Sequence, residues 1–257
     1  MKTLLLVTVQ LLLFVGASFG QLLPENSTEI VSKRDANSKT YQKADGTLET
    51  IISAGQIHYQ SNGEWVPFNT EIVSSNSGTF AFESRENTLQ SFFPAQASTG
   101  SSIALRFDEY EISIGTSKKF VTAMNNDAYP TEIGHLSGNI PALIKDNSVT
   151  YNSKYQGMSD EYLVENGMLK NNFIIDKAPS FMAGLTQDYF GLQEELTLPD
   201  GWIIVPMEPT MESIISTSLK ILDDKGEHIL TIPAPFIYEK ENTSNDGSAP
   251  IIGKYML

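Results

Sequence analysis

The sequence contains no cysteine, which excludes disulfide bonds, zinc sites built on thiolates and catalysis by a thiol. A chain of 257 residues can bury a core large enough to fold without such cross-links. The absence of cysteine also fits export from a bacterium better than passage through the endoplasmic reticulum.

Histidine is scarce as well, with three residues in the whole chain. His58, His135 and His228 lie far apart, and no pair has the spacing of a metal-binding motif. Strand alternation predicts that His58 and His228 lie on exposed faces, opposite the apolar residues. The loop at 242–247 carries oxygen-bearing side chains but lacks the acidic positions of a calcium loop, so we expect no metal and no cofactor.

No pattern typical of a catalytic site is present, since the sequence lacks G-x-S-x-G, a Gly-rich phosphate loop and a dinucleotide fingerprint. Asp108, Glu109 and Glu111 cluster between two predicted strands, and a pair of carboxylates can hydrolyse a glycosidic bond. Such clusters arise by chance among 31 Asp and Glu residues, and they also protect sheet edges from pairing. We therefore predict no catalytic residue, with a glycoside-active enzyme as an alternative.

Positive charge is in short supply, because 17 Lys and Arg face 31 Asp and Glu, which gives a formal net charge of −14. A field of that sign repels nucleic acid and anionic membrane surfaces. After residue 20 no apolar run reaches the roughly 20 residues that a membrane-spanning helix needs. We therefore expect neither nucleic acid nor a membrane as a partner of the mature chain.

The first twenty residues are predicted to be a secretory signal peptide. Lys2 provides the positive charge, residues 4–15 form an apolar run too short to span a bilayer, and Ser18 and Gly20 place small side chains before a cleavage site. The mature chain is expected to begin at Gln21. Its predicted location is outside the cell or at the cell surface, with the periplasm as a further option.

Short apolar segments with period two alternate with turn formers, which predicts an all-β chain of antiparallel β-sandwiches with little or no helix. Asn and Gly tolerate the positive φ of type I′ hairpin turns, and turn dipeptides occur at Asp45-Gly46, Asn62-Gly63, Asn166-Gly167 and Asp200-Gly201. The predicted strands include 56–60, 64–68, 80–83, 103–107, 110–114, 148–151, 161–164, 168–175, 202–205, 219–222 and 229–232.

The mature chain is predicted to hold a flexible leader at 21–40, a β-sheet domain or half-sandwich at 41–130, and a second one at 131–257. The boundary is placed in residues 125–141, which are rich in turn formers, and a single large sandwich is the alternative. An apolar run at 251–257 predicts a strand that ends with the chain. We expect later parts of a longer polypeptide, or a partner, to cover that edge.

The two tryptophans, Trp65 and Trp202, lead to a further alternative. Exposed indole rings stack on sugars, so a carbohydrate-binding module would use them as its ligand contacts. The competing interpretation is that both rings are packed in the core. Their exposure in the folded protein distinguishes the two interpretations.

Several short stretches follow one another along the chain in a characteristic order: Arg34–Tyr41, Asp45–Thr47, Ile57–Tyr59, Asn62–Trp65, Asp160–Lys170 and Ile229–Tyr238. Together they resemble the N-terminal β-rich module of large secreted or cell-surface bacterial proteins of the RHS-repeat and DNRLRE-domain type, with a Bacteroidetes-like texture. The resemblance implies a non-catalytic structural or interaction module. Its implied partners are other domains of the same polypeptide or a surface protein, with a glycan as a further option.

Export is expected to remove the first twenty residues. Protein recovered outside the producing cell should therefore start at Gln21, and its intact mass together with its N-terminal peptide measures this directly. Exported protein that still begins at Met1 would contradict the prediction.

Overall fold

A computed structural model describes the protein at residues 26–123, 131–136, 138–152, 158–175, 189–207, 218–234, 236–237 and 251–252. Across these residues the regular structure is antiparallel β-sheet apart from one short 3-10 turn, which confirms the predicted all-β class. No helix within them is long and apolar enough to cross a membrane. The chain divides into two compact units, Met1–His58 and Tyr59–Leu257.

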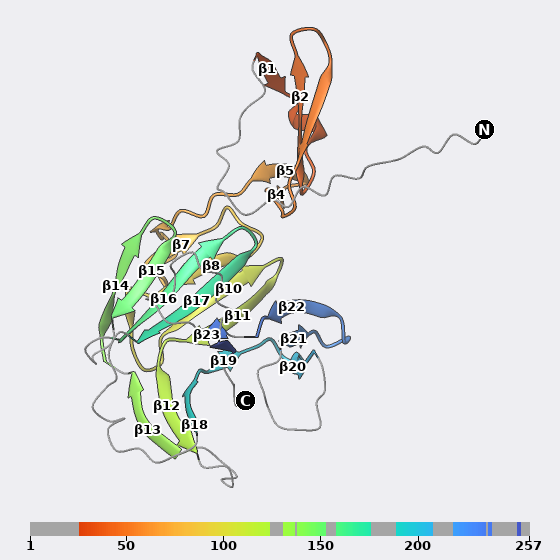
Figure 1. The fold of residues 1–257 in the computed structure, drawn as a ribbon. Coiled ribbons are helices and arrows are strands. Elements are labelled where there is room, and N and C mark those ends of the chain that lie inside the picture. The colour runs from red at the N-terminus through yellow and green to blue at the C-terminus, as the bar shows by residue number, and fades with distance from the viewer. Residues whose placement is uncertain are drawn as a thin grey trace, which may run out of the picture. The chain divides into compact units, whose positions relative to one another are not determined.

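The smaller unit is a three-stranded sheet with a 3-10 turn after its first strand (Figure 1). In chain order its elements are β1 (Ser27–Glu29), η1 (Val31–Lys33), β2 (Ser38–Lys43) and β3 (Leu48–Ile52), and β2 is the central strand. Arg34 fastens η1 to β1, because its guanidinium donates to both carboxylate oxygens of Glu29, at 2.6 and 3.1 Å. Within the predicted flexible leader at 21–40, residues 27–29 and 38–40 are strand residues of this sheet, and 21–25 lie outside the described residues.

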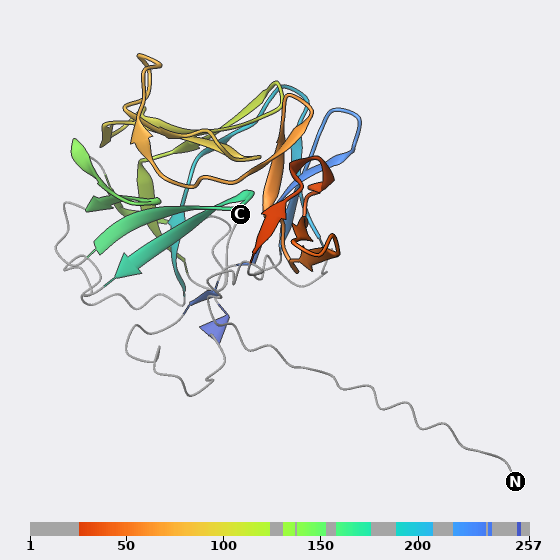
Figure 2. The same ribbon diagram turned by 90° about the horizontal axis from the view of Figure 1, so that it is seen from above.

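A β-sandwich forms the main part of the larger unit (Figure 2). One sheet has six strands, β6 (Val73–Ser74), β7 (Phe82–Ser84), β8 (Gln90–Phe93), β10 (Ser102–Phe107), β11 (Tyr110–Gly115) and β19 (Leu196–Thr197), in the order β19-β11-β10-β8-β7-β6. The other has five, β9 (Gln96–Ala97), β14 (Ile140–Lys145), β15 (Ser148–Asn152), β16 (Met158–Glu165) and β17 (Met168–Ile175), in the order β17-β16-β15-β14-β9.

The core lies between these two sheets, and alternate side chains of the strands fill it. β16 shows this most clearly, since Met158, Asp160, Tyr162 and Val164 point inward and are buried while the residues between them are not. The core also draws on the segments that flank the sandwich. Its buried apolar members are Ile72, Leu89, Phe93, Ala97, Ile103, Leu105, Ile112, Val149, Tyr151, Tyr162, Val164, Trp202 and Ile221.

Smaller sheets complete the larger unit. They are the hairpin of β4 (His58–Ser61) and β5 (Glu64–Pro67); the sheet of β12 (Lys118–Ala123), β13 (Thr131–Leu136) and β18 (Tyr189–Gln193); the sheet of β20 (Ile203–Pro206), β21 (Leu219–Leu222) and β22 (His228–Ile232); and the pair β23 (Phe236–Ile237) and β24 (Ile251–Ile252). The predicted boundary at 125–141 lies inside this unit, because core residues come from both sides of it. Of the predicted last strand, 253–257 lie outside the described residues.

The four turn dipeptides predicted from the sequence differ in backbone geometry. Asn62 and Gly63 both have positive φ, 52° and 82°, as a type I′ turn requires. At the other three dipeptides only the glycine has positive φ, so a different type of turn joins those strands. Asn62-Gly63 is therefore the dipeptide whose conformation matches the predicted hairpin turn in full.

Asn87 is a buried side chain that holds the β16–β17 hairpin from a distant part of the sequence. Its Nδ2 donates to the carbonyl of Glu165 at 2.7 Å, and its Oδ1 accepts from the N–H of Gly167 at 2.8 Å. The amide thus bonds to one backbone acceptor and one backbone donor at the hairpin turn. The loop before β8 is thereby fixed against the opposite sheet.

Replacing Asn87 by Ala should lower the free energy of unfolding by about 1–3 kcal/mol, because a backbone donor and a backbone acceptor lose their partner. Urea titration of both proteins measures the difference. The matched control is Asn76→Ala, at an exposed loop position, which should change stability by less than about 0.5 kcal/mol. Equal effects of the two substitutions would show that the amide bonds of Asn87 do not stabilise the turn.

Candidate functional site

β3 is an edge strand of the smaller unit and carries an exposed apolar row. Leu48 is 54% exposed and Ile52 is 76% exposed, and the two lie on one face of the strand because they are four residues apart. β2 pairs with one edge of β3, and within the part of the chain that the structure describes no strand pairs with the other. An open edge beside apolar side chains is an arrangement to which a further strand can add.

The opposite face of β3 makes contacts within the smaller unit. Glu49 pairs with Lys43 of β2 at 2.6 Å, and the Tyr41 ring of β2, on the same face, is buried. Thr50 lies between Leu48 and Ile52, and its hydroxyl is 3.0 Å from that of Thr40. Leu48 and Ile52 are thus the exposed apolar residues of a strand in which Glu49 and Thr50 contact β2.

The two tryptophans differ in their surroundings. Trp202 is 8% exposed, and its ring centroid lies 4.8 Å from that of Tyr110 and 6.0 Å from that of Phe107. This placement agrees with the core interpretation and leaves no indole face open for a sugar. Trp65 lies on β5 and is half-buried.

His58 is fully buried, so the prediction of an exposed strand histidine is wrong for this residue. Its backbone N–H donates to the carbonyl of Ala36, and its Nδ1 lies 2.7 Å from the carbonyl oxygen of Asp35. His58 is the last residue of the smaller unit, and the segment before β2 in the same unit contacts it, which alternation along a single strand cannot reveal. His228 is exposed, as predicted, and the side chain of His135 lies outside the described residues.

The acidic trio between β10 and β11 serves the hairpin there. Asp108 occupies a turn position with φ of 49°, and Glu111 accepts from Arg106 Nε at 2.6 Å. Among the residues whose placement is described, no three His, Asp or Glu residues are grouped as a metal site would require. The trio is thus accounted for by a turn and an ion pair across two paired strands.

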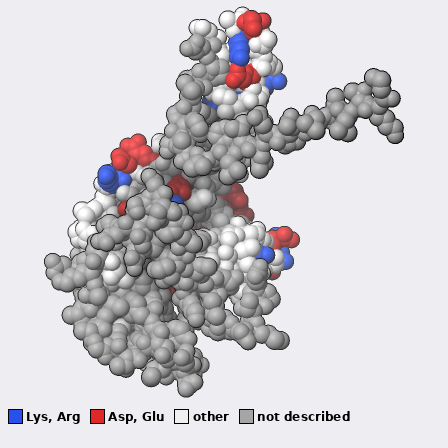
Figure 3. Space-filling model, viewed as in Figure 1, with Lys and Arg blue, Asp and Glu red and all other residues white. Residues whose placement is uncertain are grey.

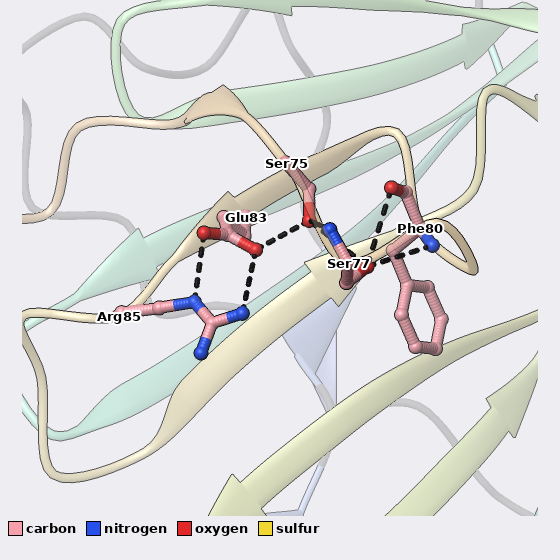
Figure 4. Close-up of polar contacts among 5 residues, drawn as sticks. All are labelled: Ser75, Ser77, Phe80, Glu83 and Arg85. Atoms are coloured by element: carbon pink, nitrogen blue, oxygen red, sulfur yellow. Dashed lines mark hydrogen bonds and ion pairs between the residues drawn. The ribbon is translucent and has the colours of Figure 1, made fainter.

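A polar network lies on the face of the six-stranded sheet that is turned away from the core (Figure 4). Arg85 donates to both carboxylate oxygens of Glu83, at 2.7 and 3.0 Å, and the Ser75 hydroxyl donates to the same carboxylate. The Ser77 N–H donates to the Ser75 hydroxyl, and the Phe80 N–H donates to the Ser77 hydroxyl, each at 3.1 Å. The hydrogen bonds from Arg85 lower the pKa of Glu83, so this carboxylate stays ionised and paired.

Two arginines cover the ring of Phe92 beside this network. The guanidinium carbon of Arg106 lies 4.3 Å from the ring centroid, and that of Arg85 lies 4.9 Å from it. Phe92 is fully buried beneath them. Because Arg85 is paired with Glu83 and Arg106 with Glu111, neither cation is left unpaired for an anionic ligand.

A buried ion cluster joins β12 to β16. The Lys118 side chain is 2% exposed, and its Nζ lies 3.0 Å from Asp160 Oδ1 and also contacts Glu194. The other oxygen of Asp160 accepts from the Tyr162 hydroxyl at 2.8 Å, and Nζ lies 5.4 Å from the centroid of the same ring. Asn171 of β17 donates to Glu194 at 3.0 Å. The cluster therefore connects three strands and the segment after β18.

Burial and neighbouring charges shift the pKa values of Lys118 and Asp160 in opposite directions. Burial alone lowers the pKa of Lys118, but the carboxylates of Asp160 and Glu194 outweigh it, so the pKa is raised. For Asp160 burial is the larger effect, and it raises the pKa although Lys118 opposes it. Oδ1 of Asp160 has no well-aligned hydrogen bond, so its contact with Lys118 is an ion pair. Lys118 and Asp160 are buried while Glu194 is 37% exposed, so the cluster anchors its strands from the interior outward.

Sequence reasoning missed both Lys118 and Asp160. One signal was available, because Asp160 falls in the inward-facing row of a strand that alternates regularly. The chain matches no protein-family model, and no similar curated protein or solved structure was found. The resemblance to modules of the RHS-repeat and DNRLRE type therefore stays a prediction.

Replacing Lys118 by Met should destabilise the protein by about 3–5 kcal/mol at pH 7, because Asp160 is left buried without its cation. The deficit should shrink as pH falls, since an unpaired Asp160, its pKa already raised by burial, takes up a proton and loses its charge. Urea unfolding of the variant and the parent at pH 7 and pH 5 measures both effects.

The matched control is Lys119→Met on the same strand, where the side chain is exposed and lies 3.7 Å from the equally exposed Glu132. Its effect should stay within about 1 kcal/mol at either pH. A Lys118→Met deficit that is the same at both pH values would contradict the assignment of the loss to an ionised Asp160.

Proposed function

We propose that this chain is a non-catalytic structural or interaction module of a secreted or surface-exposed bacterial protein, and that β3 is the edge through which it joins its partner. The observation that carries the proposal is the apolar row of Leu48 and Ile52 beside the open edge of this strand. Natural sheets usually protect such edges with charges, bulges or covering segments. Within the described residues no strand pairs with the outer edge of β3, and this supports a role in strand addition.

The distribution of charge is compatible with a binding role. On the face in Figure 3, several groups of described charged side chains hold both signs side by side. Arg34 with Glu29, and Arg85 with Glu83, are pairs of this kind. Internal pairing occupies these charges, so the proposal rests on the apolar side chains and the backbone edge of β3.

The proposed partner is an extended segment with apolar residues at alternate positions. Backbone hydrogen bonds to the open edge of β3 would provide affinity, and contacts with Leu48 and Ile52 would set the register. Such a segment could belong to a later domain of the same polypeptide or to a surface protein. Nucleic acid is not proposed, because the formal net charge of −14 opposes it.

Site-specific photocrosslinking tests the proposal. With a photoreactive residue in place of Ile52, irradiation of producing cells should yield a discrete adduct, because this side chain would lie against the partner. The same chain carrying Leu48→Thr should yield at least about fivefold less adduct, because one of the two apolar contacts is removed. Peptide mass mapping of the adduct identifies the segment that is bound.

A photoreactive residue at position 64 is the control, because Glu64 is exposed and lies on β5, outside the smaller unit. An identical adduct from positions 52 and 64 would show non-specific contact. No adduct from position 52, with the protein correctly exported, would rule out β3 as the interaction edge.

A further inference from the structure

An open groove lies beside the β4–β5 hairpin in the larger unit. Its volume is about 460 Å³, within the range of small-molecule sites. None of its lining residues was singled out as a ligand contact from the sequence. They are Tyr59, Ser61, Val66, Pro67, Phe68, Asn69 and Glu86.

Two aromatic rings give the groove an apolar surface. The ring centroids of Tyr59 and Phe68 lie 5.5 Å apart with an interplanar angle of 29°, so the rings are stacked. Val66 and Pro67 add aliphatic surface next to them. The stacked pair and these aliphatic side chains give the groove apolar surface that can pack against the C–H face of a pyranose ring.

Polar groups surround this apolar surface. Burial and the Glu86 carboxylate raise the pKa of Tyr59, although a hydrogen bond with Ser61 opposes the rise, so the Tyr59 hydroxyl keeps its proton beside Glu86. Asn69 uses its Oδ1 to accept from the Glu71 N–H at 3.1 Å, which leaves its amino group available as a donor. The Asn69 N–H donates to the carbonyl of Glu86 at 3.0 Å, which fixes these two residues side by side.

We propose that this groove binds a neutral carbohydrate, whose ring stacks on Tyr59 and Phe68 while its hydroxyls bond to Asn69 and Glu86. A hydroxylated ring needs an apolar face together with several donors and acceptors at its rim, and the groove has both. The site does not rest on the interaction proposed for β3, which lies in the other unit.

The charge of the groove excludes an anionic ligand. Glu86 is the one acidic or basic residue in its lining, and the chain as a whole carries −14. A basic peptide side chain would satisfy Glu86 but would leave the amide of Asn69 without a role. The mixture of one carboxylate, one amide and hydroxyl groups therefore favours a neutral sugar.

Calorimetric titration of the purified chain tests the site, with cellohexaose, mannohexaose and xylohexaose as separate neutral probes. At least one should bind saturably. Tyr59→Leu, which keeps apolar volume but removes the ring, should weaken that binding about fivefold to tenfold. Glu86→Gln should weaken it about fivefold, because an ionised acceptor is lost. Thermal melting of each variant confirms that it is folded.

Glu64→Gln is the matched control, because Glu64 is an exposed carboxylate on β5 that does not line the groove. Its binding should equal that of the parent chain. Silence with all three neutral probes, or binding that survives both Tyr59→Leu and Glu86→Gln, would overturn the site. Tight binding of acetyl-arginine amide or of oligogalacturonate with no binding of neutral sugar would overturn the ligand class. Photocrosslinking from position 52 is a separate readout that these groove variants should leave unchanged.

Discussion

The interaction on which the larger unit depends is the inward row of β16, where a tyrosine and an aspartate lie side by side. Tyr162 packs in the apolar core, with its ring centroid 6.3 Å from that of Phe93 in the opposite sheet. Its hydroxyl bonds to Asp160, and Asp160 pairs with Lys118 of β12. One strand thus connects the sandwich core to the neighbouring sheet in a protein that has no disulfide bonds.

Replacing a single partner of this ion pair should lower the stability of the fold. An ion pair withdrawn from water contributes little net stability, but removing one partner leaves a bare charge in the core. The six-stranded sheet also keeps its charged side chains paired. Phe93 is packed inside, whereas Phe92, the adjacent residue, lies outside beneath two arginines that are themselves paired with carboxylates. Internal pairing occupies these charges, and the candidate binding features lie elsewhere.

Those features are an open strand edge in the smaller unit and an aromatic groove in the larger one. They suit different ligands, because β3 presents backbone groups beside Leu48 and Ile52, whereas the groove combines stacked rings with single polar groups. The module that we propose would hold a protein segment at the strand edge and a sugar in the groove. The signal peptide predicted for the first twenty residues would place both surfaces outside the cytoplasm.

The sequence by itself determined the all-β class and many of the strands, because period-two alternation is a local property. The predicted strands at 168–175 and 219–222 coincide with β17 and β21 from end to end. Only the tertiary structure decided which residues meet. His58 is buried because the segment at Asp35 and Ala36 folds over it, and Tyr59 stacks on Phe68 across a hairpin. Lys118 forms an ion pair with Asp160, which lies far from it in the sequence. Contacts of this kind depend on how strands are placed in space, which alternation within one strand does not encode.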